Sequence, residues 1–508
     1  MRTRNKIWIA FGLLLLLCQA LPALAVDLEK KIVKARLQNG LTVLIMERKF
    51  SPTVSLFIRY RVGAVDEIPG QSGAAHFLEH MMFKGTTTIG AKNYPAEKKL
   101  LSRIEKTGEQ LDRERKKQGS ADPRKIRRLE ERLKKLQNGH LRDFIPNEID
   151  RLYTENGASG MNASTGQDMT TYFINLPANK IELWARIESD RLLHPVFRQF
   201  YTERDVILEE RRQRVEASPD GKLYEAFMER AYSTHPYGIP IVGLPKDLTF
   251  MSPAAIHAIH RKYLSPRRIV IAVVGDIDPS KTMELIRRYF GKIPDAGAPA
   301  ARIPAEPEQK AERKAQVWFD ASPSMIIGYH KPAPPAREDY VFDVLETILS
   351  KGRTSRLYDR LVISRQIAQS ISAANGVPAA RYPNLFTIFA RPRHPHTNEE
   401  LQTAILGEIE AIKTAPVTEE ELARAKNQLK MDFIKSLDSN SELASILSYT
   451  ELLLGDYRYF SDYLPQIQKV TAGDIQAAAI RYLTAENRTV AVLNRKTAPE
   501  EGGGAHEK

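Results

Sequence analysis

Three residues in the first quarter of the chain, His76, Glu79 and His80, have the types and the spacing of a zinc site. They lie in the run GAAHFLEHMMFKGT, from Gly73 to Thr86, whose density of apolar and small residues predicts a buried helix. Residues four apart share one face of a helix, so the two imidazoles point the same way and can bind one zinc ion. Glu79 reaches the same side and can take a proton from a water on the metal. The order His-x-x-Glu-His reverses the commoner His-Glu-x-x-His zinc motif.

Five residues alone leave a second interpretation open, an ordinary core helix whose two histidines serve only packing. A third ligand would decide between the two. A helix predicted from Arg198 to Glu216 carries Glu203 and Glu210, which are seven residues apart, or two helical turns, and therefore share a face. Taken alone, such a pair of acids is more often a solvated helix face than a metal site.

Residues 1–25 have the pattern of a secretory signal peptide. Basic residues precede an apolar stretch from Ile7 to Leu17, and Ala23 to Ala25 supply a small-x-small cleavage site. Cys18 is the only cysteine, so the mature chain would have none, and zinc would be held by histidine and carboxylate alone. A lipoprotein anchored at Cys18 is the alternative, although Leu17 stands where a small residue is expected. We expect an exported, periplasmic protein of a bacterial envelope.

Composition excludes several classes of protein. The 508 residues, 42% hydrophobic and 27% charged, suffice for two to four domains with real cores. The formal net charge is +13, but acids and bases are interspersed and no nucleic-acid-binding module is present, so the excess indicates general surface character. Association with a membrane surface is an alternative. No phosphate-binding loop, serine elbow or dinucleotide fingerprint occurs.

The pentad is flanked by predicted strands that would position it. Val33 to Leu37 and Leu41 to Met46 form a predicted strand pair around the turn Asn39-Gly40, and a third strand follows from Val54 to Val62. Beyond the pentad, the alternation from Met169 to Leu176 predicts another strand.

Residues 95–145 are predicted to form a charged helical hairpin of coiled-coil character. Leu and Ile recur three or four apart among dense Lys, Arg and Glu, and Gly119 to Pro123 interrupt the run. A self-packed pair of helices that projects into solvent is the simplest interpretation, and a dedicated membrane or nucleic-acid device is the alternative.

The second half of the chain repeats the first. Ser252 to Val274 aligns with Thr471 to Leu493, and HFLEHMMFKG, which begins at His76, aligns with DVLETILSKG, in which Asp343 and Thr347 replace the two histidines. The spacing between these two anchors is about 48 residues longer in the first half, which is about the length of the hairpin. The hairpin is therefore predicted to be an insertion into a duplicated unit whose second metal site has lost its ligands.

The predicted fold class is α/β (α+β): two tandem homologous domains of mixed sheet with helices. The predicted organisation after the signal peptide is a zinc-bearing N-terminal domain at 26–294 with the hairpin inserted, a linker at 295–312 rich in Pro and Ala, a C-terminal domain at 313–496, and a tail at 497–508.

Taken together, HFLEHMMFKGT, the Asn162-Ala163 strand followed by DMTTY, the segment from Glu203 to Glu210 and the tandem halves resemble the pitrilysin/insulinase family of zinc peptidases, the inverzincins. The two-domain members related to mitochondrial processing peptidase, and their bacterial relatives, are the most similar. The resemblance implies a zinc metalloendopeptidase that cleaves peptides or unfolded polypeptides and binds one Zn²⁺ per chain.

Carried over residue by residue, the resemblance implies that His76, His80 and Glu210 bind zinc, that Glu79 is the general base, and that Glu203 supports the site from behind. Glu209 is the alternative third ligand, because the hairpin lengthens the usual gap between the pentad and that ligand.

The resemblance also implies how substrate is held. The strand with Asn162 and Ala163 would lie at a sheet edge and pair with an extended peptide through its backbone. Members of the family enclose the site in a chamber, which favours short or unfolded peptides.

One departure from the family pattern concerns the C-terminal half. The family usually places there an Arg and, seven residues later, a Tyr that contact substrate, whereas this chain has Val362 and Gln369, with Arg365 out of register. We therefore expect the zinc-bearing subunit of a heterodimer whose homologous partner supplies the Arg and the Tyr. The alternative function is a non-catalytic scaffold or assembly subunit of an envelope complex.

Overall fold

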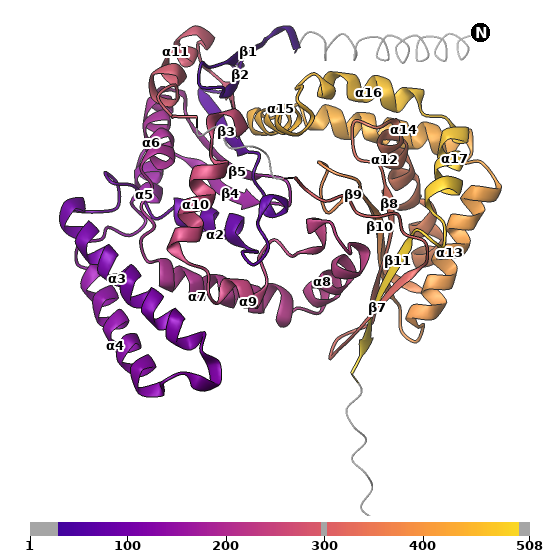
Figure 1. Cartoon of the computed structure of the whole chain (residues 1–508). Coiled ribbons are helices and arrows are strands. Elements are labelled where there is room, and N and C mark those ends of the chain that lie inside the picture. Colours follow the sequence, from indigo (N-terminus) through magenta and orange to yellow (C-terminus); the bar gives the residue numbers. More distant parts are fainter. Residues whose placement is uncertain (1–28, 296–301, 497–508) are drawn as a thin grey trace, which may run out of the picture. The chain divides into compact units, whose positions relative to one another are not determined.

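The computed structural model describes residues 29–295 and 302–496 (Figure 1). The predicted signal peptide, part of the predicted linker and the predicted tail lie outside these residues. The strands are β1 (Ile32–Arg36), β2 (Thr42–Glu47), β3 (Thr53–Tyr60), β4 (Ser159–Thr165), β5 (Thr170–Pro177), β6 (Ile269–Gly275), β7 (Arg313–Phe319), β8 (Ser324–Lys331), β9 (Ala368–Val377), β10 (Asn384–Pro392) and β11 (Arg488–Arg495). The helices are α2 (Ala74–Met82), α3 (Tyr94–Arg115), α4 (Pro123–His140), α5 (Glu148–Glu155), α6 (Ile181–Leu193), α7 (Phe200–Arg211), α8 (Pro219–Ala231), α9 (Pro245–Leu248), α10 (Pro253–Tyr263), α11 (Pro279–Phe290), α12 (Arg337–Ser350), α13 (Asn398–Thr414), α14 (Glu419–Lys435), α15 (Asn440–Leu454), α16 (Tyr459–Lys469) and α17 (Ala472–Tyr482).

The first sheet has the strand order β1-β2-β6-β3-β5-β4. Strand β2 pairs parallel with β6, and the pairs β1–β2, β3–β6, β3–β5 and β4–β5 are antiparallel. Every residue of β6 is buried, as expected for a central strand that is covered on both faces. The turn between β1 and β2 needs Gly40, whose φ is +92° and where a Cβ would lie 2.5 Å from the Arg267 side chain. The strands predicted around the pentad are confirmed.

The second sheet repeats the topology of the first. Its order is β7-β11-β8-β10-β9, with β7 and β11 parallel and the other neighbours antiparallel. If β7 to β11 are matched in chain order with β2 to β6, the two sheets have the same strand order, and only β1 lacks a counterpart. Helix α2 follows β3 in the first half as α12 follows β8 in the second. The predicted duplication and the predicted α/β class are therefore confirmed.

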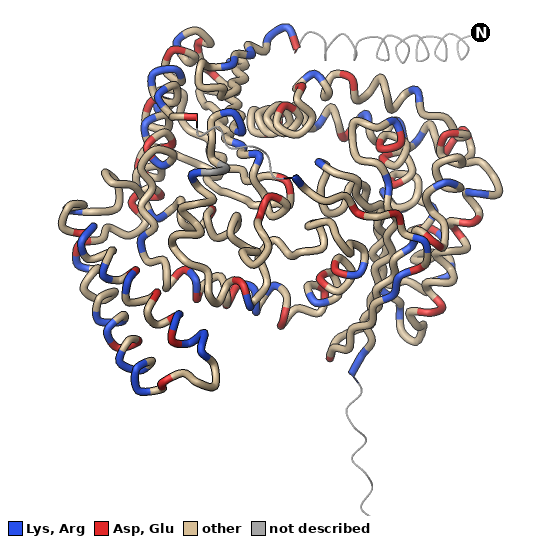
Figure 2. Tube along the Cα trace, viewed as in Figure 1, with Lys and Arg blue, Asp and Glu red and all other residues tan. Residues whose placement is uncertain are grey.

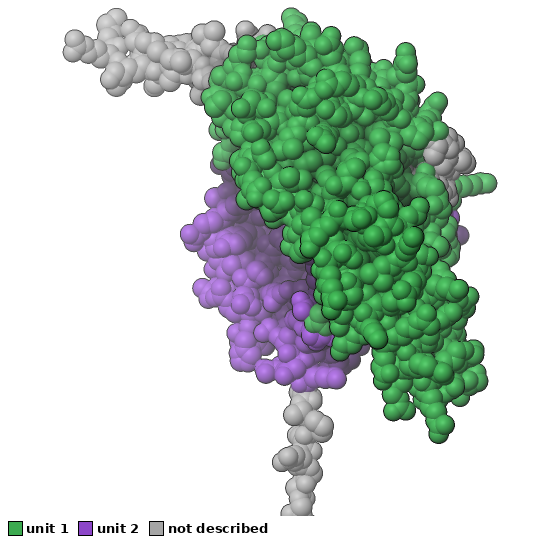
Figure 3. Space-filling model, turned by 90° about the vertical axis from the view of Figure 1, so that its left-hand side faces the viewer, with its two compact units in different colours: residues 1–209, 240–303, 430–469 green, residues 210–239, 304–429, 470–508 purple. Residues whose placement is uncertain are grey.

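The chain forms two compact units, each built from three segments (Figure 3). Unit 1 comprises residues 1–209, 240–303 and 430–469, and unit 2 comprises residues 210–239, 304–429 and 470–508. The two compact units therefore do not coincide with the predicted consecutive domains 26–294 and 313–496.

Two helices account for this difference. Helix α15, from the C-terminal half, packs on β3 and β6 of the first sheet, and Arg59 of β3 donates hydrogen bonds to Ser448 and Ser445 of α15. Helix α8, from the N-terminal half, packs on β7 and β11 of the second sheet. Each sheet buries one of its faces with a helix from the other half of the sequence.

The predicted helical hairpin is confirmed as α3 and α4, which pack against each other in unit 1. Pro123 begins α4 after Asp122, whose side chain accepts hydrogen bonds from the backbone of Arg124 and Lys125. Most of the predicted apolar seam is buried, and Leu101 and Ile126 are half-buried. The buried members are Ile104, Leu111, Leu129, Leu133 and Leu136.

Among residues 29–295 and 302–496, no helix is both long and apolar enough to cross a membrane.

Candidate metal centre

The helix that carries the pentad is held at its N-terminus by an acid and a glycine. Both carboxylate oxygens of Glu67 accept backbone hydrogen bonds, from Gly73 and Ala75, each 2.8 Å long. Gly73 has a φ of +86°, and a Cβ there would lie 2.6 Å from the carbonyl oxygen of Val242, so only glycine fits. The start of α2 is therefore fixed in position before the first histidine.

His76 and His80 lie on one face of α2, with ring centroids 4.7 Å apart. One ligand atom each from His76, His80 and Glu210 all lie within 4.8 Å of one another, and among the described residues this is the one group of three or more such side chains. Glu209, the alternative third ligand, is exposed and is not part of the group, whereas Glu210 is half-buried. The compact units divide within α7, between Glu209 and Glu210, but α7 is one continuous helix.

Glu203 stands behind the second histidine. Its carboxylate accepts a hydrogen bond of 2.8 Å from Nδ1 of His80 and forms an ion pair of 2.6 Å with Nζ of Lys84. Burial alone would raise the pKa of Glu203, but these contacts outweigh burial and lower the pKa to about 2. An ionised Glu203 keeps the proton of His80 on Nδ1, which leaves the lone pair of Nε2 for a metal.

Glu79 is half-buried beside these ligands and accepts a hydrogen bond of 2.5 Å from the hydroxyl of Thr165. Thr165 is the last residue of β4, which packs against α2. The contact orients the carboxylate that sequence reasoning assigned as the general base.

Strand β4 is the edge of the first sheet and carries Asn162 and Ala163, opposite Phe173 and Tyr172 of β5. Asn162 is exposed, and its side chain accepts a hydrogen bond from the backbone N–H of Ala163. The predicted substrate strand therefore lies at a sheet edge and ends beside Glu79.

Arg198 ties the two metal-bearing helices to the hairpin. Its fully buried guanidinium donates to both oxygens of Glu97 on α3, at 2.8 and 3.0 Å, and Glu97 also contacts Nε2 of His140 at 2.7 Å. The same guanidinium donates to the carbonyl oxygens of Lys84, Thr86 and Ile89, which follow α2 directly. Arg198 precedes α7 by two residues, so one side chain fixes the end of α2 against the start of α7.

Sequence reasoning gave no role to Thr165, Lys84 or Arg198. Lys84 belongs to the quoted HFLEHMMFKGT run, so its position was visible although its partner was not. Thr165 and Arg198 carry no sequence signal, because their roles depend on contacts with residues 86 and 101 positions away.

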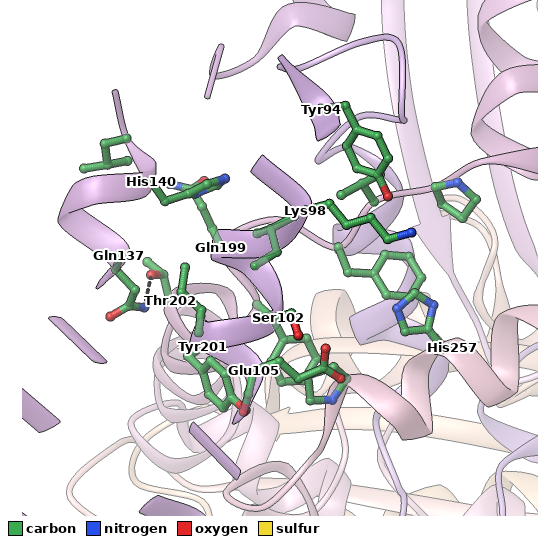
Figure 4. A pocket seen from close by; sticks show the side chains of 18 of the residues that line it. Tyr94, Lys98, Ser102, Glu105, Gln137, His140, Gln199, Tyr201, Thr202 and His257 are labelled. Carbon is green, nitrogen blue, oxygen red and sulfur yellow. Dashed lines mark hydrogen bonds between the residues drawn. The ribbon is translucent and has the colours of Figure 1, made fainter. Parts of the chain in front are cut away.

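A cavity of about 590 Å³ separates the hairpin from α7 and α10, and it is distinct from the metal centre. Figure 4 shows its polar rim, including Tyr94 and Lys98 of α3 and His257 of α10. Gln137 of α4 reaches Thr202 of α7 across it with a hydrogen bond of 3.2 Å.

The counterpart of the pentad in the second half lies on α12 and holds no ligand set. Thr347 donates to the backbone carbonyl of Asp343, and Asp343 accepts a hydrogen bond of 2.8 Å from Asn375 of β9. The buried ammonium of Lys331 pairs with Asp339, one turn before Asp343, at 2.5 Å. Asp339 thus has a lysine as its partner, and Asp343 has a side-chain amide.

The donor set of the first copy fits Zn²⁺. Two imidazoles and one carboxylate are a known three-ligand set for catalytic zinc, and a fourth position stays open for water. His80 has the carboxylate partner on its second nitrogen that zinc-binding histidines usually have.

Comparisons with known proteins find similar sequences along most of the chain. The sequence profile "Insulinase (Peptidase family M16)" matches residues 42–117 and 144–244, and the profile "Peptidase M16 inactive domain" matches residues 251–429. The curated "Zinc protease PqqE" of Helicobacter pylori is 28% identical over 467 residues, covering 90% of this chain and 91% of that protein. An uncharacterized zinc protease of Mycobacterium leprae is 24% identical and covers 92% of this chain and 94% of its own.

Solved structures share the fold. The crystal structure of a protease from Helicobacter pylori superposes with a TM-score of 0.76 at 25% identity, covering 91% of this chain and 99% of that one. A structure described as the peptidase M16 inactive domain from Pseudomonas fluorescens gives a TM-score of 0.73 at 17% identity, covering 92% of this chain and 98% of that one.

Proposed function

Because this chain belongs to the insulinase family of peptidases, family M16, we propose that it is a zinc metalloendopeptidase that hydrolyses short or unfolded polypeptides. The observation that carries the proposal is the meeting of His76, His80 and Glu210 beside the hydrogen-bonded carboxylate of Glu79. Inactive relatives exist in this family, and the intact ligand set favours activity here.

The roles of the residues follow from their positions. His76, His80 and Glu210 would hold Zn²⁺, which when bound polarises a peptide carbonyl and lowers the pKa of water. Glu79 takes the proton of the attacking water and delivers it to the departing amine. Thr165 holds the carboxylate of Glu79 in place, and Glu203 holds the ring of His80.

We propose that substrate binds as an added strand on β4. Strand β4 is an edge strand, and Asn162 and Ala163 lie on it close to Thr165, the residue that contacts Glu79. Pairing with the backbone of an extended peptide requires little of its side chains, which favours unfolded substrates over folded ones.

We further propose that the enzyme works as a heterodimer with a homologous chain. Where the family usually has an Arg and a Tyr, this chain has half-buried Val362 and exposed Gln369. The partner would supply both side chains. An exported, periplasmic location is part of the same proposal and rests on the N-terminal sequence pattern.

The test measures bound zinc and cleavage of an unstructured peptide, with the wild type and with Glu79→Gln. We expect about one zinc per chain in both proteins, and a loss of at least about 100-fold in kcat for the variant, since a general base contributes about 10²–10⁴-fold. Loss of zinc in Glu79→Gln would contradict the assignment of Glu79 as a non-ligand.

The same assay distinguishes a heterodimeric enzyme from an enzyme that is active alone. Wild-type protein that holds zinc but cleaves only after addition of a co-purifying homologue supports the heterodimer. Full activity of the chain alone would contradict the heterodimer, and zinc without cleavage in either state would favour the scaffold function.

A further inference from the structure

Helix α4 has two faces of opposite character. Leu129, Leu133 and Leu136 are buried, on the side of the helix that packs against α3. The rest of the helix carries seven Lys or Arg against two Glu, a net charge of +5. The three leucines therefore pack against α3, and Lys and Arg make up much of the rest of the helix (Figure 2).

Six of the seven basic side chains are exposed and have no ion pair among the described residues. Lys125 is the exception, since it pairs with Glu114 of α3 at 2.7 Å. At 100° per residue the six lie within an arc of about 160° that excludes the three leucines, and the exposed Glu131 lies within the same arc. The six are Arg124, Arg127, Arg128, Arg132, Lys134 and Lys135.

Helix α4 lies outside the features that the family shares. The insulinase profile stops at residue 117 and resumes at residue 144, so it includes all of α3 but omits α4. The second half of the chain, which repeats the sheet, has no helical pair between its corresponding elements β8 and β9 other than α12 and a short π-helical turn. The cationic face is an addition to this chain that the common peptidase fold does not require.

We propose that the exposed face of α4 binds the anionic headgroups of a lipid membrane surface. Long Lys and Arg side chains on a straight helix can reach a planar layer of phosphates without matching any particular shape. From Arg124 to Lys135 the helix rises about 17 Å, so the six charges act on one patch of surface. Each basic side chain near such a surface strengthens binding about five-fold.

Other polyanions fit this face less well. Protein interfaces are depleted in Lys and depend on aromatic or apolar anchors, and the cationic face contains none. Single-stranded nucleic acids are bound by aromatic stacking, which this face also lacks. Leu141, which caps the C-terminus of α4, is 55% exposed and can enter the headgroup layer. This proposal does not depend on the peptidase function.

The test is sedimentation of the full chain with lipid vesicles at low salt. One set of vesicles is phosphatidylcholine alone, and the other contains about 30% phosphatidylglycerol. The variant replaces four residues of the face, Arg124→Gln, Arg127→Gln, Arg128→Gln and Lys135→Gln. Both proteins have the same apolar N-terminal stretch, so a difference between them reports the face of α4.

A matched control removes the same charge elsewhere in unit 1. Its substitutions replace exposed basic residues of α6, α11 and the following turn that have no ion pair among the described residues: Arg186→Gln, Lys281→Gln, Arg287→Gln and Lys292→Gln. Thermal unfolding followed by circular dichroism verifies that both variants fold.

We expect the wild type and the control to bind the anionic vesicles, and the α4 variant to bind at least about 10-fold more weakly, as the loss of several basic side chains implies. Binding should also fall in high salt, because the contacts are exposed. Equal binding to both kinds of vesicle, equal loss in the control, or tighter binding to a DNA fragment than to the anionic vesicles would each overturn the proposal.

Discussion

Glu79 and Glu203 show how two acids of one type acquire different roles. Glu79 accepts a hydrogen bond from a neutral hydroxyl, that of Thr165. Glu203 accepts a hydrogen bond from the imidazole of His80 and forms an ion pair with Lys84. The second environment lowers the pKa of Glu203 to about 2 and fixes it as a permanent anion. The hydroxyl of Thr165 orients the carboxylate of Glu79 for the role of general base that we propose for it.

At the same scale, His235 in unit 2 is a buried residue that links stability to pH. Its ring is 5% exposed, and Nδ1 accepts a hydrogen bond of 3.1 Å from the backbone N–H of Tyr237. Burial lowers the pKa of His235 to about 4. Nδ1 cannot keep this acceptor role once it carries a proton.

We expect the free energy of unfolding to fall as the pH drops from about 6.5 towards 4. In this window the unfolded chain binds a proton at residue 235 and the folded chain does not, so acid favours unfolding. Between pH 7 and pH 5 the contribution of His235 is about 2 kcal/mol. Denaturant unfolding at both pH values, with a chelator present throughout, measures it.

His235→Gln should reduce that difference, because glutamine does not titrate and its carbonyl oxygen can still accept the hydrogen bond. The control His394→Gln changes an exposed histidine and should leave the difference unaltered. An unchanged pH dependence in His235→Gln would contradict the assignment.

At the scale of elements, the centre depends on how α2 and α7 are fixed relative to each other. Arg198 joins the segment after α2 to the segment before α7 and to Glu97 of α3. A second buried arginine, Arg204 of α7, pairs with Asp112 of α3 at 2.6 Å and donates to the carbonyl oxygen of Met251, and within residues 29–295 and 302–496 it has no hydrogen bond to the segment after α2. Both arginines therefore anchor α3, and Arg198 also holds the segment after α2.

Arg198→Lys should weaken zinc binding about 10-fold, since lysine keeps the charge but cannot reach Glu97 and three carbonyl oxygens together. Arg204→Lys should lower thermal stability about as much as Arg198→Lys does, but it should leave zinc affinity unchanged. Competition with a chelator measures affinity, and calorimetry measures stability. Equal losses of zinc affinity in the two variants would show that Arg198 has no specific role in positioning.

At the scale of the whole molecule, the two halves of the sequence complete each other's cores. Helix α15 covers β3 and β6 in unit 1, and helix α8 covers β7 and β11 in unit 2. The sequence repeat therefore describes the sheets but does not describe independent folding units.

We expect residues 26–294 to fold poorly alone, because the fragment lacks α15 and exposes the face of β3 and β6 that α15 buries, including Arg59. Solubility and cooperative thermal unfolding of the fragment measure this. Co-expression with residues 295–508 should restore both. A soluble fragment that unfolds cooperatively by itself would contradict the prediction.

Much of the fold was predictable because its signals are local. The turn at Gly40, the alternation of β5 and the spacing of the hairpin seam depend on neighbours a few residues apart. The His-x-x-Glu-His spacing likewise placed His76, Glu79 and His80 on one helix before any tertiary contact was known.

The sequence by itself thus determined the pentad, the strands around it, the hairpin and the duplication, since helix and strand periodicities are written in adjacent residues. Only the tertiary structure decided that Glu210 rather than exposed Glu209 meets the two histidines, that Thr165 and Arg198 support the centre, and that α8 and α15 cover the sheets of the opposite halves. These are contacts between residues far apart in the chain, and their geometry is set by packing, which no local pattern encodes.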